Sequence, residues 1–168
     1  MKRIILHWSA GGYYPNMHDL QCYHFLVDKE GNVHQGRYFP EANELCRPNQ
    51  YAAHTGGGNT GSIGVAMCAM AGFKHKNSVG DYPITAKQFE ATCELCAQLA
   101  LQYNIKITPD TVMTHYEFGV KNPRTTSAGK IDITYLPPYS WVSIPDIGAF
   151  IRSKIKWYIN KIELDNNK

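Results

Sequence analysis

The alternation of apolar and polar positions predicts three buried strands, two of which end on a histidine. Near the N-terminus the branched run Ile4-Ile5-Leu6 ends on His7, and a turn of small residues follows. Residues 63–70, IGVAMCAM, form a nearly unbroken apolar run, which is typical of an interior strand with both faces covered. A third short run, VMTH at 112–115, again ends on a histidine, His115.

A hairpin is predicted between the first two runs. Residues 23–39, YHFLVDKEGNVHQGRYF, contain two β-rich stretches on either side of a turn in which Gly31 and Asn32 can adopt positive φ. The segments 71–83 and 116–141 lack such a pattern, and the second is rich in Gly, Pro, Ser and Thr. Both are therefore expected to be loops.

Two helices follow from apolar positions that recur every three or four residues. The first is expected to open at Thr85, with Gln88 completing a capping box. The second begins near Ser143, with Pro145 in its first turn and Asp146 completing another box. The apolar stripe of the first consists of Phe89, Cys93, Cys96, Ala100 and Tyr103. That of the second consists of Ile147, Phe150, Ile151, Ile155, Tyr158, Ile159 and Ile162. Its basic residues lie off this stripe, which favours a core-facing helix over a membrane-surface one.

Together these elements predict a single-domain α/β fold in which a central mixed β-sheet is flanked by helices. The length of 168 residues suits one domain. We expect it to span residues 1–168, with a core at about 3–162 and a disordered tail at 163–168. The hydrophobic content of 43% and the charged content of 18% are those of a folded chain rather than a disordered one.

Charge and hydropathy restrict the classes of partner. The net charge of +3 is too small to indicate nucleic-acid binding. No apolar run approaches the roughly 18 residues needed to cross a membrane, and the first apolar run is too short for a secretion signal. We therefore expect a chain without a transmembrane segment, synthesised in the cytoplasm without a signal peptide. We also expect a monomer.

The five cysteines do not indicate a complete set of internal disulfides, because their number is odd. Cys93 and Cys96 form a C-x-x-C pair, but it lies in the middle of a predicted helix rather than at its start. No second pair follows at zinc-finger spacing. Ordinary helix packing is therefore favoured over a redox or metal role.

Two histidines and one carboxylate form a candidate metal site. His7 and His115 both end predicted strands, which are rigid and open at a sheet edge. Asp132, two residues after Lys130, is the third candidate. Two imidazoles and a carboxylate make a three-ligand zinc site that leaves one position for water. These three residues alone are weak evidence, because the chain has seven histidines and the distance in sequence between His7 and Asp132 matches no motif.

The order of five motifs adds a family resemblance. The stretches ILHWSA, YHFLVDKEGNVHQGR, AAHTGGGNTGSIGV, THYEF and GKID resemble, in this order, the zinc-dependent N-acetylmuramoyl-L-alanine amidases of the type-2 class. Phage amidase-type lysozymes and peptidoglycan-recognition proteins share that fold. The resemblance covers about residues 3–136 and implies a central mixed sheet of the same kind.

Carried over to this chain, the resemblance implies a role for each site residue. His7, His115 and Asp132 would be the three zinc ligands. Lys130 would stabilise the oxyanion of the tetrahedral intermediate, and Tyr23 would orient or deprotonate the hydrolytic water. The residues implied to contact substrate are Trp8, His54, Thr55 and Asn59.

Two departures from the family pattern leave alternatives open. One branch carries a glutamate base on the strand after SIG, where this chain has Ala66, so the branch that uses a tyrosine is favoured. A phenol with a reference pKa near ~10 is a poor base, so Tyr23 is as well explained as an orienting group. The segment from His115 to Asp132 is also long. It makes Glu117 a competing third ligand, because a strand would point it the same way as His115.

The resemblance implies a peptidoglycan hydrolase that cleaves the amide between N-acetylmuramic acid and L-alanine. We expect a phage or prophage endolysin, or a cell-wall lytic effector, that acts in the periplasm or outside the cell after release. The alternatives are a non-catalytic peptidoglycan-binding module and a cytoplasmic muropeptide-recycling amidase. A more remote one is a partner role in antirestriction or polymerase regulation.

Overall fold

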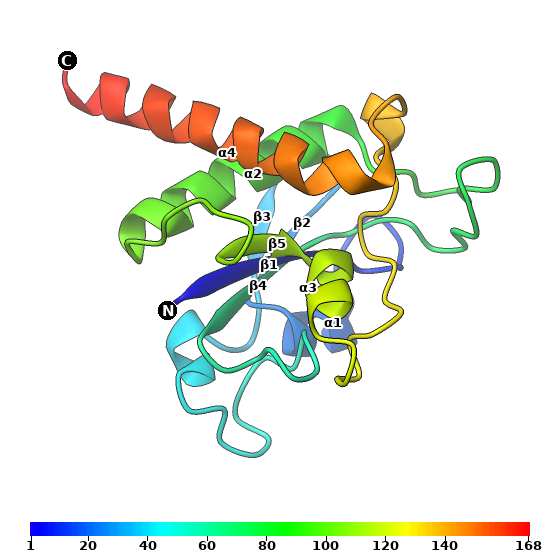
Figure 1. Cartoon of the computed structure of the whole chain (residues 1–168), viewed down its shortest axis with the longest axis horizontal. Coiled ribbons are helices and arrows are strands. Elements are labelled where there is room, and N and C mark those ends of the chain that lie inside the picture. The colour runs from blue at the N-terminus through cyan, green and yellow to red at the C-terminus, as the bar shows by residue number, and fades with distance from the viewer.

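The computed structural model describes all 168 residues and contains one five-stranded mixed sheet with the strand order β3-β2-β4-β1-β5 (Figure 1). Strands β2, β4, β1 and β5 run parallel, and β3 is antiparallel to β2. The strands are β1 (Arg3–Trp8), β2 (Phe25–Val27), β3 (Val33–Gln35), β4 (Ser62–Met67) and β5 (Val112–Thr114). The mixed α/β fold predicted from the sequence is confirmed.

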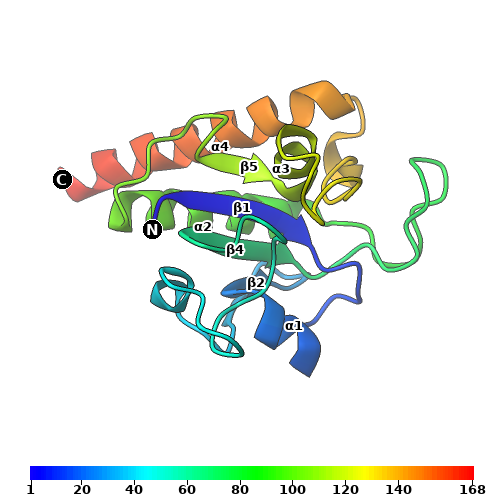
Figure 2. The ribbon, with the colours of Figure 1, turned by 60° about the horizontal axis from the view of Figure 1, so that its bottom comes forward.

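The helices cover the two faces of the sheet unequally. They are α1 (Met17–Cys22), α2 (Ala86–Gln102), α3 (His115–Lys121) and α4 (Ile144–Asn166), with 3-10 turns at Pro40–Asn43 and Pro137–Tyr139. The long helices α2 and α4 pack together on one face, while α1 lies on the other (Figure 2). No helix of the chain is both long and apolar enough to cross a membrane.

Side-chain alternation along β1 separates the core from the site. Ile4, Leu6 and Trp8 belong to the large core under α2 and α4. Successive strand residues point to opposite faces, so Ile5 and His7 face the other side. There Ile5 packs with Met113 of β5 and Phe118 of α3. All six residues of β4 are buried, as its apolar run predicts for an interior strand.

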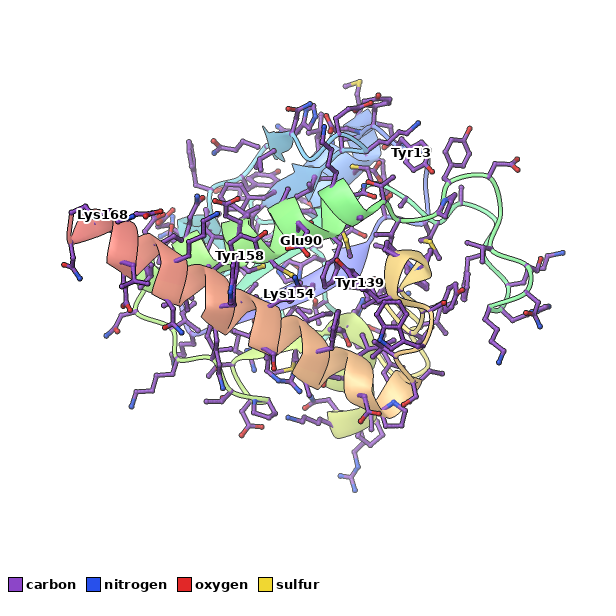
Figure 3. The ribbon with its side chains drawn as sticks, turned by 90° about the horizontal axis from the view of Figure 1, so that it is seen from above. Tyr13, Glu90, Tyr139, Lys154, Tyr158 and Lys168 are labelled. Carbon is purple, nitrogen blue, oxygen red and sulfur yellow. The ribbon has the colours of Figure 1, made fainter.

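The contact between α2 and α4 includes a polar cluster around Glu90. The Glu90 carboxylate accepts hydrogen bonds from the hydroxyls of Tyr158 (2.6 Å) and Tyr139 (2.9 Å). Lys154 of α4 forms an ion pair with the same carboxylate at 2.7 Å. Figure 3 shows these four side chains meeting where the two helices cross. The cluster fixes α4 on α2 and positions the turn at Pro137–Tyr139.

The last helix confirms the core-facing prediction and corrects its ends. Its apolar stripe is buried or partly buried against the core, and Arg152 pairs with Glu117 of α3. The expected capping box is absent, because the Ser143 hydroxyl donates to the Asp146 carboxylate instead of accepting from a backbone N–H. The helix continues to Asn166 and so includes most of the residues expected to form a disordered tail.

Two short helices lie where the sequence predicted none. Helix α1 precedes the hairpin, and Tyr23 is its C-terminal capping residue rather than the first residue of a strand. Helix α3 occupies the start of the segment 116–141, which was expected to be a loop. Its N-cap is Thr114, whose side chain forms a capping box with Glu117. His115 is therefore the first residue of a helix and not the last residue of a strand.

The remaining turn and cysteine predictions are largely confirmed. Of the two residues expected to take positive φ in the hairpin turn, Gly31 does so, at 86°, and Asn32 does not. Cys93 and Cys96 are buried in the core face of α2, as ordinary helix packing requires. All five cysteines are free thiols.

Candidate active site

Two neighbouring parallel strands bring the histidines together. β1 pairs with β5 in a register that places Leu6 opposite Thr114. His7 follows Leu6, and His115 follows Thr114. The two imidazoles therefore meet at the carboxyl ends of the two strands, with ring centroids 4.7 Å apart. Asp132 reaches the same point from the loop that follows α3. Both histidines and Asp132 are buried.

The three ligand atoms have the spacing of a zinc site. Asp132 Oδ2 lies 3.1 Å from His7 Nδ1 and 3.4 Å from His115 Nδ1, and all three atoms lie within 4.8 Å of one another. Ligand atoms about 2.0–2.1 Å from a tetrahedral ion are separated by about 3.3 Å. The donor set and its spacing therefore fit zinc.

Hydrogen bonding fixes the tautomer of His115. Its Nε2 lies 2.9 Å from Ser127 Oγ. The Ser127 hydroxyl donates to the carbonyl oxygen of Gly56 at 2.7 Å, so its oxygen is free to accept from His115 Nε2–H. A histidine protonated at Nε2 keeps the lone pair of Nδ1 for a metal. Ser127 thus holds His115 in the form that a ligand needs.

His54 fixes the tautomer of His7 in a similar way. Its Nε2 lies 3.3 Å from the carbonyl oxygen of Ser62, which only accepts, so this nitrogen carries the proton. Burial lowers the pKa of His54 well below its usual value and keeps the ring neutral. Its Nδ1 is then an acceptor, and the hydroxyl of Thr55 donates to it at 2.7 Å. His7 Nε2 lies 3.2 Å from this Nδ1 and 3.3 Å from Thr55 Oγ1, both of which can only accept from it, so His7 Nε2 carries a proton. His7 Nδ1 is left free to face Asp132.

The ring of His54 depends on a glycine in the central strand. A Cβ atom on Gly64 would lie only 2.5 Å from His54 Cγ, so no larger residue fits there without moving the ring. His54 lines the cleft but is almost fully buried. Both of its ring nitrogens are held by protein groups. Its contacts are those of a residue that supports His7.

The other residues implied to contact substrate lie in different places. Thr55 is fully buried under His54. The Asn59 side-chain oxygen accepts from the backbone N–H groups of His54 and Thr55, which closes the loop. Neither Thr55 nor Asn59 lines the cleft. Trp8 does line it, and its ring packs against Phe73 with a centroid distance of 4.9 Å.

Tyr23 and Lys130 both line the cleft that His115 and Asp132 also line. We call it the metal cleft, and its volume is about 460 Å³. The Tyr23 ring lies 5.1 Å from that of His7, measured between centroids. Burial, together with the negative charge of Asp132, raises the pKa of Tyr23. Without a metal the phenol is therefore a proton donor at neutral pH. Lys130 is exposed at the rim.

Asp132 is the only carboxylate that lines the cleft. Burial by itself raises its pKa, but without a metal a proton on Nδ1 of His115 or His7 donates to the carboxylate, and these contacts hold the pKa below its usual range. A metal ion would displace that proton. Burial lowers the pKa of His7. Both directions favour the forms that bind a metal, an anionic carboxylate and a neutral imidazole.

The surroundings of Glu117 and Ala66 bear on the two departures from the family pattern. Glu117 pairs with Arg152 at 3.1 Å and lies outside the cluster of ligand atoms. Because α3 is a helix, residues two apart do not share a face. Ala66 stands opposite His7 in the β1–β4 register, so the position that could carry a glutamate base has no carboxylate.

His24 is a fully buried histidine outside the cluster of candidate metal ligands. Its Nδ1 accepts from the backbone N–H of Gly64, and its Nε2 lies 2.9 Å from the side-chain oxygen of Asn43.

The support that Ser127 and His54 give to the candidate ligands was not found from the sequence. The partners of these residues lie 12 and 47 positions away, and no local pattern records such contacts.

Comparison with known proteins identifies a family and similar folds. The family model for N-acetylmuramoyl-L-alanine amidase matches residues 1–130. A mutant form of PlyL has a similar fold, with a TM-score of 0.55 and 23% identity over 92% of this chain and 84% of that one.

Two further solved structures are more distant. Peptidoglycan recognition protein SD from Drosophila matches with a TM-score of 0.47 and 21% identity, over 75% of this chain and 74% of that one. The amidase LysC from Clostridium intestinale matches with a TM-score of 0.47 and 18% identity, over 74% and 75%. No curated protein sequence matches the chain. On the evidence of the family model, which covers more than half of its length, the chain belongs to the N-acetylmuramoyl-L-alanine amidase family.

Proposed function

We propose that the chain is a zinc-dependent amidase that cleaves the bond between the lactyl group of N-acetylmuramic acid and L-alanine in peptidoglycan. The observation that carries the proposal is the meeting of His7 Nδ1 and His115 Nδ1 at Asp132 Oδ2, beneath a cleft that His115 and Asp132 line. A zinc ion held there supplies Lewis acidity toward a carbonyl and lowers the pKa of water to about 7.

The residues around the ligands supply the remaining chemistry. Lys130 presents a cation at the rim of the cleft, where it stabilises negative charge that develops on the scissile carbonyl oxygen. Tyr23 lies against His7 and donates a hydrogen bond that orients the reacting groups. With Asp132 used as a ligand and Ala66 beside His7, the proton reaches the leaving amine through water, aided by Tyr23.

Digestion of purified sacculi tests the proposal. The zinc-loaded protein is expected to release stem peptides with a free L-alanine amino group and to leave the glycan strands intact, as measured by mass spectrometry. His115→Ala is expected to release none. His18→Ala, which alters an exposed histidine of α1, is the matched control and is expected to act like the wild type.

Two results would count against the proposal. Equal digestion by His115→Ala and by the wild type would show that the site is wrong. Stoichiometric zinc and muropeptide binding without any release of stems would instead indicate a non-catalytic binding module. The cell-wall setting and the monomeric state expected from the sequence remain predictions.

A further inference from the structure

A second cavity continues from the metal cleft. It has a volume of about 720 Å³ and lies between the loop at residues 73–76 and the segment 131–145. Phe73 and Ile131 line both this cavity and the metal cleft. Figure 1 shows the segment 71–83 projecting from the body of the molecule after β4. We name this second cavity the aromatic groove.

Aromatic rings lead from the metal ligands into the aromatic groove. Trp8, the residue after His7, packs against Phe73 with a centroid distance of 4.9 Å. Phe73 in turn stacks on Tyr135, with a centroid distance of 6.2 Å and an angle of 18° between the rings. These three rings therefore form one continuous wall from the candidate metal ligands to the aromatic groove.

The far end of the groove exposes apolar side chains to water. Trp141 is 75% exposed, and Ile131 and Ile144 are each 48% exposed. The Trp141 ring contacts Tyr139 edge-on, and the Tyr139 hydroxyl is bonded to Glu90. The exposed ring thus rests on a support that the α2–α4 contact fixes. A large exposed apolar surface on a rigid support is typical of a binding site.

The two ends of the cleft differ in chemistry. Only one end has the aromatic groove, whose lining contains no carboxylate and carries Lys74, His75 and Lys76 as donors. The cavity beyond the other end shares Cys22 and Ala53 with the metal cleft, and it contains Arg37 and amide side chains. A guanidinium binds carboxylates in a bidentate manner, so this second end suits an acidic, amide-rich peptide.

We propose that the aromatic groove binds the glycan strand on the muramoyl side of the scissile amide; this assignment rests on the proposed function. The apolar faces of pyranose rings and the methyl groups of N-acetyl substituents pack on Trp141, Tyr135 and Phe73. Lys74 and Lys76 donate hydrogen bonds to sugar oxygens. The enzyme consequently prefers muramoyl peptides that remain attached to further sugars.

Trp141→Ala tests the assignment, with Trp157→Ala as the matched control. Trp157 is also exposed, at 54%, but it lies on α4 away from the groove. The substrates are a muramoyl peptide with a single sugar and a tetrasaccharide that carries the same stem. Trp141→Ala is expected to lower kcat/KM about tenfold or more for the tetrasaccharide and to lower it much less for the single-sugar substrate. Trp157→Ala is expected to change neither.

A binding measurement separates this inference from the proposed function. The chain has three tryptophans, so its indole N–H groups give three assignable NMR signals. Stem-free tetrasaccharide is expected to shift the signal of Trp141 and to leave that of Trp157 in place. If the wild type cleaves neither substrate but shows this shift, the proposed function fails and the glycan assignment stands.

Three outcomes would overturn the assignment. One is an equal loss of kcat/KM for both substrates in Trp141→Ala. Another is an unchanged kcat/KM for the tetrasaccharide. The third is a Trp141 signal that responds to free stem peptide and not to stem-free glycan, which would place the acidic peptide in the groove.

Discussion

Replacing Ser127 by alanine removes one hydroxyl group that serves two buried partners. The hydroxyl accepts from His115 Nε2 at 2.9 Å and donates to the carbonyl oxygen of Gly56 at 2.7 Å. Ser127 is fully buried, so water does not readily replace it. The variant therefore leaves a carbonyl oxygen without a donor, and it frees the ring of His115 to take either tautomer.

The size of both effects follows from these contacts. A buried polar group without a partner costs about 1–3 kcal/mol, so the free energy of unfolding of the metal-free protein should fall by roughly this amount. Loss of a partner that orients a metal-binding histidine weakens metal affinity by about 10–100-fold. We expect both changes in Ser127→Ala.

Zinc titration against a competing chelator measures the loss of metal affinity. Urea unfolding in the presence of EDTA measures the loss of stability. Ser62→Ala is the matched control. Ser62 is equally buried, its hydroxyl accepts from Arg3 Nε at 3.0 Å, and alanine keeps the backbone carbonyl that His54 contacts. It should lose stability without losing zinc affinity. Wild-type zinc affinity in Ser127→Ala would refute the argument that the tautomer of His115 is fixed by this hydroxyl.

Three further variants test other parts of the structure. Gly64→Ala should displace the His54 ring, lower the free energy of unfolding by about 1–3 kcal/mol and weaken zinc binding, as measured by the same titrations. Lys130→Met should lower kcat by about 10²–10³-fold while zinc still binds stoichiometrically; unchanged kcat would exclude its oxyanion role. Glu90→Gln should reduce the free energy of unfolding at pH 7 by about 1–2 kcal/mol in urea titrations.

The Glu90 prediction also has a pH dependence of known sign. Burial raises the pKa of Glu90, but the bonds from Lys154, Tyr158 and Tyr139 outweigh it, and the net pKa lies below the usual value of 4.5. A carboxylate whose pKa is lowered by folding stabilises the protein above its unfolded pKa. The difference between wild type and Glu90→Gln should therefore be full at pH 7. It should disappear as the pH falls through the folded pKa, and a constant difference down to that pH would contradict this reading.

Long periodic segments were predictable because their signal is local. The run at 63–70 and the helix that opens at Thr85 bury continuous apolar faces, so pattern alone identifies them. In α2 the expected capping box of Thr85 and Gln88 forms. The candidate metal ligands were first chosen from their positions in the sequence. The family resemblance then supplied the spatial relation that residues 125 positions apart do not show by themselves.

The short helix α3 was missed for a tertiary reason. Its seven residues include Gly119 and Val120, which are weak helix formers. Its N-terminal signature, a threonine followed three residues later by Glu117, is present in the sequence. The helix is held by long-range contacts that the sequence does not reveal, above all the ion pair between Glu117 and Arg152. This error also led to the expectation that His115 ends a strand and that Glu117 competes as a ligand.

The support of the metal ligands could not be predicted for a similar reason. The family resemblance implied that His54 contacts substrate, and His54 does line the cleft. Its role depends on the tautomers of His7 and His54, which are set by a carbonyl of β4. Only the assembled sheet brings these groups together.

A crystal structure of the zinc-loaded protein, with anomalous data collected at the zinc edge, tests the central claim most directly. One strong peak is expected about 2.0–2.1 Å from Nδ1 of His7 and of His115, with a carboxylate oxygen of Asp132 as the third protein ligand. A peak bound through the Nε2 atoms, a peak at other residues, or no peak in protein soaked with excess zinc would contradict it.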